Sequence, residues 1–254
     1  MQKLLYGFLV IDLHSHVLPG LDDGVRTLED ACELAAVAAA EGVTAIAATP
    51  HVRADYPTTV EVMEEGVAEL RAELALRGID IQIIHGAELD LGLLWAVPWP
   101  ELLRFTFAQT GRYLLLEVPY RGLPLALEAA VTRLVQRGVT PLLAHPERNP
   151  EVQDRPDRVA PLVEAGALVQ VTAASICGDR DRAAQAAALR LVDLGLVHVL
   201  ASDAHGPHIA RDGLAAAARR VDPALARYLT VDVPAAIVTG DPVPERFPSA
   251  GSVS

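Results

Sequence analysis

Histidines and carboxylates are concentrated in a few short polar segments of a largely apolar sequence. The segment DLHSHVLPGLDDG, residues 12–24, contains His14 and His16, followed by Asp22 and Asp23. Side chains two positions apart on a strand project to the same side, so both imidazoles can bind one ion. The later segments ATPH, GAEL, LLLEVP, LAHPER and SDAH add six candidate ligands: His51, Glu88, Glu117, His145, Asp203 and His205. Imidazole and carboxylate together suit Mn²⁺, Fe²⁺, Co²⁺ or Zn²⁺, and so many ligands predict a cluster of ions.

Each candidate ligand alone has an ordinary structural explanation, because a single histidine at the end of a strand is more often a hydrogen-bonded loop residue. Glu117 is harder to explain in this way, since it interrupts the apolar run RYLLLEVP and a buried charge must be paired or coordinated. In many amidohydrolase-type barrels a carboxylated lysine bridges two metals. The only lysine here is Lys3, which stands at the wrong place for that role. Glu88 is therefore the predicted bridge.

The elements that must position these residues alternate between apolar strand-like runs and Ala/Leu-rich helical segments. Seven strands are predicted, over residues 7–14, 43–50, 79–89, 112–119, 139–146, 167–173 and 197–205. Most are apolar on both faces, which is typical of a covered parallel sheet. This alternation predicts a (β/α) barrel or an open doubly wound sheet. Six of the strands carry a candidate ligand near the carboxyl end, where a barrel builds its active site.

The composition narrows the class of protein. The chain has 254 residues, of which 51% are apolar, and a formal net charge of −12. This acidic balance argues against nucleic acid as a partner, because phosphate binding needs clustered Lys and Arg. No apolar run approaches the about 20 residues of a membrane helix, and the two cysteines stand far apart, so neither membrane insertion nor a disulfide framework is expected. We expect a cytoplasmic protein with one domain over residues 1–240 and a loose Pro/Ser-rich tail over 241–254.

Taken in order, the motifs resemble those of the PHP (polymerase and histidinol phosphatase) superfamily. The match is closest to its manganese-dependent bacterial protein-tyrosine phosphatases, which are associated with capsule and exopolysaccharide synthesis. The resemblance extends from about Ile11 to Pro234 and includes LTVDVPAAIVTGDPVP near the end of the chain. It implies an α/β fold, a distorted (β/α)7 TIM-like barrel of the PHP type, with a cluster of three metal ions, expected to be Mn²⁺.

The resemblance also implies which residues hold each ion. The first ion would be bound by His14, His16, Glu88 and Asp203. Glu88 would bridge to a second ion, bound also by Glu117 and His145. The third ion would be bound by Asp22, His51 and His205. Asp22 is preferred over Asp23 because its spacing from His14 matches that of the family.

The implied reaction is hydrolysis of a phosphate monoester. A hydroxide held between two ions would attack phosphorus, because metal binding lowers the pKa of water toward about 7. Arg148 is expected to bind phosphoryl oxygens, since a guanidinium can bond two of them. The alternative for Arg148 is a surface ion pair with Glu147 or Glu151. Arg211 is a second candidate, although it stands one residue beyond the family's usual position.

Further residues have expected roles around the reacting group. Asp203 and His205 are expected to assist the leaving group in addition to binding metal. Arg53 and Arg121 follow predicted strands and are candidates to line the mouth. The cysteine-based route of other tyrosine phosphatases is not supported, because it needs an arginine six positions after the cysteine, where this chain has Ala38 and Ala183.

The expected substrate is a phosphotyrosine protein, which the resemblance suggests is a bacterial tyrosine kinase of polysaccharide export. A tyrosyl leaving group has a pKa near 10 and departs with little help from an acid. The alternative is a histidinol-phosphate or other small-molecule phosphatase on the same scaffold. Asp22 and Glu117 favour the tyrosine phosphatase, because relatives that act on small phosphates often have histidines there. A third hypothesis, a non-catalytic metal-binding protein, would be favoured by a missing ligand, and no expected ligand is missing.

Overall fold

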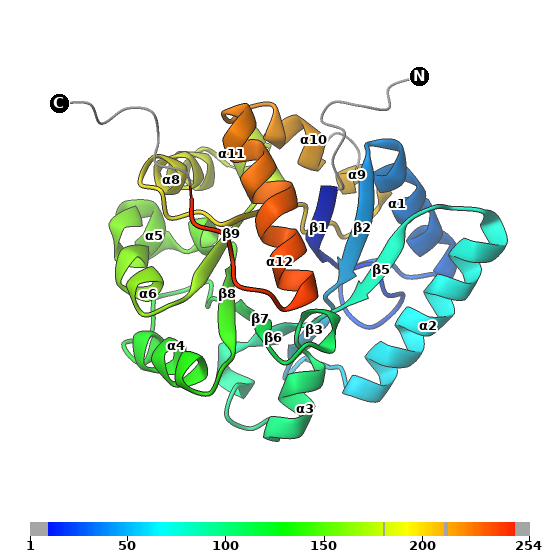
Figure 1. The fold of residues 1–254 in the computed structure, drawn as a ribbon, viewed down its shortest axis with the longest axis horizontal. Helices are drawn as coiled ribbons and strands as arrows, with labels where there is room; N and C mark the ends of the chain where they lie inside the picture. Colours follow the sequence, from blue (N-terminus) through cyan, green and yellow to red (C-terminus); the bar gives the residue numbers. More distant parts are fainter. Residues whose placement is uncertain (1–9, 180, 211–212, 247–254) are drawn as a thin grey trace.

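Parallel strands form the centre of the molecule and helices surround them (Figure 1). The computed structural model describes residues 10–179, 181–210 and 213–246. One sheet has the strand order β1-β2-β5, formed by Val10–Ser15, Val43–Ala48 and Gln82–His85. The second sheet has the order β10-β9-β8-β7-β6-β3-β4. Its strands are Val199–Ala201, Leu168–Thr172, Thr140–Ala144, Tyr113–Glu117, Glu88–Asp90, His51–Arg53 and Tyr56–Pro57.

The two sheets are parts of one barrel. β2 resumes after Thr49 and Pro50 as β3, and β5 resumes after residues 86–87 as β6. A parallel bridge between Ser15 and Ala204 joins the end of β1 to the segment that follows β10. In the described part of the chain, the barrel positions are therefore β1, β2/β3, β5/β6, β7, β8, β9 and β10. This is the distorted (β/α)7 barrel that the sequence predicted.

The distortion lies where two strands of the barrel are interrupted, between β2 and β3 and between β5 and β6. The prediction of a continuous strand over 79–89 is wrong, because β5 pairs with β2 in one sheet whereas β6 pairs with β3 and β7 in the other. Pro50 cannot donate to a ladder, although its carbonyl accepts a hydrogen bond from the Glu88 amide at 3.0 Å. At Gly86 a Cβ atom would lie 3.1 Å from the Thr49 side chain and 3.2 Å from the Phe107 ring. Glycine thus allows the backbone to approach closely at this break.

The helices cover the outside of the barrel. Those of ten or more residues are α1 (Leu28–Ala40), α2 (Val60–Arg77), α4 (Leu127–Gln136) and α8 (Arg182–Asp193). The shorter ones are α3 (Trp99–Arg104), α5 (Pro150–Asp154), α6 (Ala160–Glu164), α7 (Ala173–Cys177), α9 (Pro207–Ala210), α10 (Gly213–Ala218), α11 (Pro223–Arg227) and α12 (Val233–Thr239). α1 begins with a capping box between Thr27 and Asp30. None of the helices in the described ranges is both long and apolar enough to cross a membrane.

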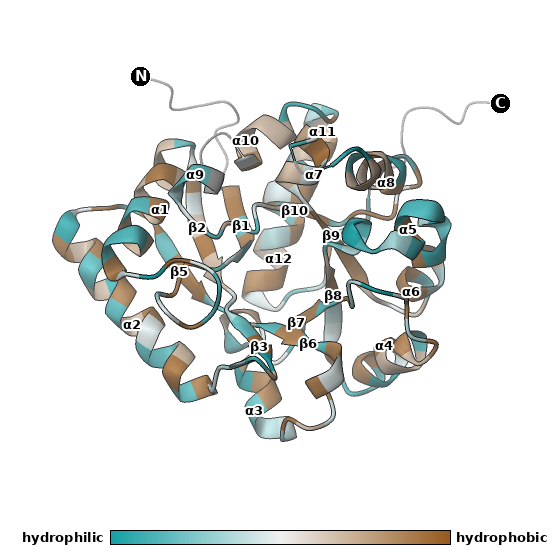
Figure 2. Cartoon of the chain, turned by 180° about the vertical axis from the view of Figure 1, so that it is seen from behind, coloured by the Kyte–Doolittle hydropathy of each residue, from teal (hydrophilic) through white to brown (hydrophobic). Residues whose placement is uncertain are grey.

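The core is formed by strand residues that are buried on both faces. β7 and β9 are buried along their full length. Figure 2 shows hydrophobic residues along the strands and many hydrophilic residues on the surrounding helices. Burial of this apolar area stabilises the barrel by about 25 cal/mol per Å². Both cysteines, Cys32 and Cys177, are free.

The start of the predicted tail packs against the barrel. The Tyr113 hydroxyl donates to the Asp241 carbonyl at 2.6 Å, and the Tyr228 hydroxyl donates to the Pro244 carbonyl at 3.3 Å. Arg246 donates to the Val192 carbonyl at 3.4 Å. The expectation of a loose tail is therefore wrong for residues 241–246, because polar side chains of the barrel hold its backbone.

Candidate metal centre

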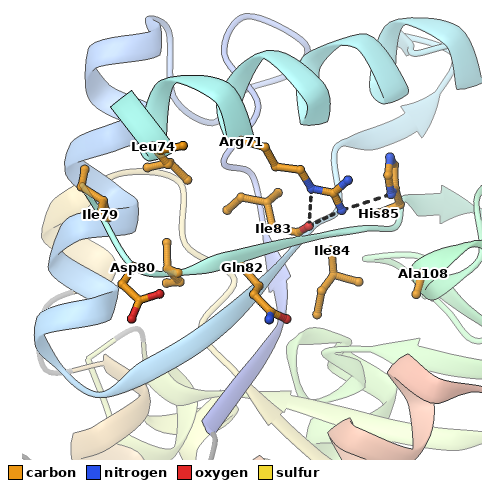
Figure 3. Close-up of a pocket in the computed structure, with 11 residues that line it drawn as sticks. Arg71, Leu74, Ile79, Asp80, Gln82, Ile83, Ile84, His85 and Ala108 are labelled. Carbon is orange, nitrogen blue, oxygen red and sulfur yellow. Dashed lines mark hydrogen bonds between the residues drawn. The ribbon is translucent and has the colours of Figure 1, made fainter. Parts of the chain in front are cut away.

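Two cavities of different character lie in the described structure. One of about 590 Å³ is lined by α2, β5 and neighbouring residues, and Figure 3 shows Arg71 beside Ile83 and His85 there. The Arg71 Nε donates to the Ile83 carbonyl at 2.9 Å. The other cavity, of about 230 Å³, contains several predicted ligands. Its lining residues are Asp23, His51, Arg53, Glu88, Tyr120, His145, Arg148, Asp203 and His205. We call this smaller cavity the metal pocket.

Glu88 lies at the centre of the candidate ligands. Its Oε1 is 2.9 Å from His145 Nε2. Its Oε2 is 3.0 Å from His51 Nδ1 and 3.3 Å from His14 Nε2. The side chain is fully buried at the start of β6. Both carboxylate oxygens of Glu88 therefore lie close to candidate ligand histidines.

The other candidates form overlapping groups around Glu88. In each group, ligand atoms lie within 4.8 Å of one another. The groups are His14, Glu88 and His145; His14, His16 and Asp203; His51, Glu88 and Glu117; and His16, Asp23, His51 and His205. Residues from β1, β3, β6 and β7 and from the loops after β8 and β10 thus meet at one end of the barrel. Parallel strands bring their carboxyl ends together, which explains why residues so distant in sequence converge.

Several buried polar atoms of the candidate ligands have no hydrogen-bond partner, and such atoms are available to bind a metal ion. Four ligand atoms are buried and have no hydrogen-bond partner: His14 Nε2, His51 Nδ1, Glu88 Oε2 and Glu117 Oε2. Leaving buried polar atoms unpaired costs about 1–3 kcal/mol each. These atoms lie close to one another and belong to the imidazole and carboxylate groups that bind divalent transition metals. The residues therefore fit a metal cluster.

In the loop after β1, Asp23 belongs to a group of candidate ligand atoms that lie within 4.8 Å of one another, whereas Asp22 does not. Asp22 Oδ2 is 2.7 Å from His16 Nδ1 and accepts from the His51 amide at 2.9 Å. Burial would raise the pKa of Asp22, but the neighbouring His16 lowers this pKa to about 2. Asp23 Oδ1 lies 3.5 Å from His205 Nε2 and 3.6 Å from His51 Nε2. The sequence-based preference for Asp22 is therefore not supported, because the Asp22 carboxylate is already held by hydrogen bonds.

The shape of this loop depends on a close approach at Gly24. A Cβ atom there would lie 2.3 Å from the His16 carbonyl oxygen. The Gly24 amide donates to Asp22 Oδ1 at 2.9 Å, and the Val25 amide donates to the His16 carbonyl at 3.2 Å. These bonds turn the loop back over the end of β1 and direct Asp22 inward.

Gln170 orients two candidate ligands and was not predicted from the sequence. Its Oε1 lies 3.1 Å from His14 Nδ1 and accepts from the His145 amide at 3.2 Å. An amide oxygen requires a proton on His14 Nδ1, which leaves Nε2 free to bind a metal. The only signal in the sequence is a glutamine inside the apolar run ALVQVTA of β9.

Two candidate ligands have strained backbones. His145 has φ 34° and Asp203 has φ 54°, both in the left-handed region that non-glycine residues seldom adopt. Such strain costs about 1–3 kcal/mol for each residue and is concentrated at functional sites. Here it turns His145 and Asp203 toward the metal pocket immediately after β8 and β10.

The carboxylates of the pocket titrate differently because their neighbours differ. Burial would raise the pKa of Glu88, but His14 and His145 hold it well below its usual range. Burial and then the negative charge of Glu88 raise the pKa of Glu117 to about 7. Burial would also raise the pKa of Asp203, but His14, His16 and Arg148 hold it well below its usual range. Glu88 and Asp203 are therefore ionised at neutral pH.

Arg148 lines the pocket, and the alternative, a surface ion pair with Glu147 or Glu151, is absent from its described contacts. Its Nη2 forms an ion pair with Asp203 Oδ2, and the side chain is only 9% exposed. Its Nε is buried without a hydrogen-bond partner. Glu147 instead accepts from the Thr172 amide at 3.0 Å, and Glu151 pairs with Arg158. Arg148 therefore lines the pocket, and one of its buried donors, Nε, has no hydrogen-bond partner among the described residues.

The other candidate arginines differ in position. Arg53 lines the pocket, and its Nη1 is 3.3 Å from Glu117 Oε1. Arg121 is exposed and does not line the pocket. Arg211 lies outside the described residues. Tyr120 also lines the pocket and was not predicted, although it stands only three residues after Glu117.

The fold and the site together define a class of protein: a metal-dependent hydrolase whose centre lies at the mouth of a (β/α)7 barrel. A family model described as capsular polysaccharide synthesis, CpsB/CapC, matches residues 10–238. The chain belongs to this CpsB/CapC family.

Individual relatives agree with this assignment. Tyrosine-protein phosphatase YwqE of Bacillus subtilis is 33% identical over 199 residues, which cover 77% of each chain. Tyrosine-protein phosphatase CpsB of Streptococcus pneumoniae is 26% identical over 239 residues, covering 90% of this chain and 98% of that protein. A solved structure from work on YwqE and CpsB, described as unique metal-dependent tyrosine phosphatases, has a TM-score of 0.84 at 28% identity. It covers 94% of this chain and 98% of that chain.

Proposed function

We propose that this chain is a metal-dependent protein-tyrosine phosphatase, a phosphoric monoester hydrolase. The observation that carries the proposal is the position of Arg148, which is 9% exposed and lines the same pocket as the carboxylate Glu88. Metal ions and a guanidinium can both stabilise the negative oxygens of a phosphate ester. The relatives named as tyrosine phosphatases support the same substrate class.

The residues of the chain have separate roles in this proposal. Bound divalent ions would supply a water nucleophile at neutral pH and neutralise charge on the phosphoryl oxygens. Arg148 binds a phosphoryl oxygen and holds the phosphorus in position. Arg53 adds positive charge at the same pocket and is itself held by Glu117. Gln170 fixes the ring of His14 through Nδ1, so that Nε2 would be free to hold an ion.

The geometry favours ligand roles over proton-donor roles for Asp203 and His205. Asp203 is ionised and pairs with Arg148. His205 Nδ1 donates to the Asp203 carbonyl at 2.9 Å, and burial, followed by the charge of His16, lowers the pKa of His205. Nε2 of the neutral ring is therefore an acceptor. A phenolate, with a pKa of about 10, leaves without an acid more readily than an alkoxide.

The ligand set that we propose has one change from the sequence-based set. Glu88 would bridge two ions, with His14, His16 and Asp203 on one side and Glu117 and His145 on the other. Asp23, His51 and His205 would hold the third ion. We propose Mn²⁺ as the working ion, since mixed imidazole and carboxylate ligands suit it.

The proposed partner is a bacterial tyrosine kinase of polysaccharide export, dephosphorylated in the cytoplasm. The support is the family's connection to capsular polysaccharide synthesis. Phosphate release from a phosphotyrosyl peptide by Mn²⁺-loaded protein tests the function, with histidinol phosphate as the comparison substrate. We expect peptide turnover that a chelator abolishes and added Mn²⁺ restores. Turnover of histidinol phosphate alone would refute the tyrosine-phosphatase assignment and retain the metal centre.

A further inference from the structure

Tyr120 is the one lining residue of the metal pocket with a large apolar surface. The other lining residues are carboxylates, arginines and histidines. Tyr120 follows β7 in the loop before α4, and 47% of it is exposed. A half-exposed ring beside a charged pocket is available to a ligand that carries both a phosphate and an apolar group.

The ring is held from one side. It stacks on His145, with ring centroids 6.1 Å apart and planes 17° apart. No described residue forms a hydrogen bond with its hydroxyl, so the ring is not held by a polar contact at its tip. Burial, then the charges of Glu88 and Glu117, raise the pKa of Tyr120 to about 12.

We propose that the Tyr120 ring contacts the aromatic ring of phosphotyrosine and so selects aryl phosphates over alkyl phosphates at this pocket. The proposal rests on the proposed function and names the residue that recognises the leaving group. Aromatic rings attract each other by offset or edge-to-face contact beyond simple area burial. A carboxylate at the same position would offer no such surface to a phenyl group.

A second tyrosine provides a matched control. Tyr56 stacks on His51, with ring centroids 5.8 Å apart and planes 11° apart, and the Arg53 guanidinium lies 5.1 Å from its ring centroid. Tyr56 thus also supports a candidate ligand histidine, but it does not line the pocket. If Tyr120 acted only by supporting His145, then Tyr56→Ala should have a similar effect through His51.

The test measures equilibrium binding of two phosphonates to the Mn²⁺-loaded full chain. Calorimetric titration compares phenylphosphonate with methylphosphonate, which differ in the ring. We expect the wild type to prefer phenylphosphonate and Tyr120→Ala to lower this preference about 3- to 10-fold. Tyr120→Phe should keep the preference because it keeps the ring, and so should Tyr56→Ala. Metal content is measured in every variant to show that the centre is loaded.

Several results would overturn the proposal. An unchanged preference in Tyr120→Ala would show that the ring makes no contact. An equal loss in Tyr120→Phe would assign the effect to the hydroxyl, and an equal loss in Tyr56→Ala would assign it to histidine support. Failure of the proposed function would give a different result, because the wild type would then hydrolyse histidinol phosphate and not the phosphopeptide. In that case, a preference for phenylphosphonate that is lost in Tyr120→Ala would still support the ring contact.

Discussion

Asp22 and Asp23 are neighbours in the chain, yet their carboxylates have different partners. Asp22 Oδ2 lies 2.7 Å from His16 Nδ1, whereas Asp23 Oδ1 lies 3.5 Å from His205 Nε2. The first carboxylate orients a candidate ligand and the second is a candidate ligand itself. This division follows from the turn at Gly24, whose amide donates to Asp22.

Asp23→Asn is expected to remove one ion from the cluster, because a neutral amide is a much poorer ligand than a carboxylate. Two ions should remain, since Glu88 and its other partners are unchanged. Metal analysis of the purified protein after loading with Mn²⁺ measures the stoichiometry. A full complement of three ions in Asp23→Asn would contradict the ligand role.

Asp22→Asn is the matched variant at the adjacent position. It should retain the stoichiometry but bind metal about 10- to 100-fold more weakly, the usual effect of losing the partner that orients a ligand histidine. A titration with Mn²⁺ measures the affinity. Loss of a whole ion from Asp22→Asn, with none lost from Asp23→Asn, would restore the sequence-based preference for Asp22.

Arg148→Ala is expected to lower kcat/KM for a phosphotyrosyl peptide by about 10²-fold or more, the scale of losing one transition-state donor. The metals should remain, because Arg148 is not a ligand. Arg121→Ala is the control, since Arg121 is exposed and lies outside the pocket. Steady-state kinetics with metal analysis checks both, and unchanged kinetics in Arg148→Ala would contradict its role.

Metal affinity is expected to fall as the pH drops below about 7. Burial and the charge of Glu88 raise the pKa of Glu117 to about 7 in the metal-free protein. A carboxylate must be ionised to bind an ion, so protons compete with the metal there. Competition from one proton on Glu117 makes metal binding about tenfold weaker at pH 6 than at pH 8. Competition titrations with a chromophoric chelator at the two pH values measure this, and equal affinities would contradict it.

His198 predicts a pH dependence of stability away from the pocket. Burial lowers its pKa to about 4, and Nδ1 accepts from the Val169 amide at 3.2 Å. In the unfolded state His198 has an ordinary pKa near 6.5. As the pH falls, the unfolded protein therefore binds this proton before the folded protein does. The contribution of neutral His198 to the free energy of unfolding is therefore complete above about pH 6.5. It is lost as the pH falls toward 4, and the loss amounts to up to about 3 kcal/mol.

Urea unfolding of the metal-free protein at pH 7 and pH 4.5 measures this loss. His198→Asn is the comparison, because its side-chain oxygen accepts the same amide hydrogen bond without titrating. The free energy of unfolding should fall less in His198→Asn than in the wild type. An equal fall in the two proteins would show that His198 does not contribute.

The sequence predicted the barrel better than it predicted the limits of its strands. Apolar runs on both faces indicate covered parallel strands, and β7, β8 and β9 lie within the predicted ranges. The strand over 79–89 was wrong, because the local pattern does not show that β5 and β6 pair with different neighbours. That break depends on Pro50, Gly86 and Phe107, which are brought together only by the fold.

The sequence by itself determined the chemistry of the centre, because residue type and strand-end position place imidazoles and carboxylates such as His14 and Glu88 at one end of a barrel. Only the tertiary structure decided which neighbouring aspartate groups with the other candidate ligands, that Gln170 contacts His14, and that Tyr120 lines the pocket. The physical reason is that strand periodicity sets the direction of a side chain locally. Loop direction is set by hydrogen bonds and close approaches between segments that are far apart in the chain.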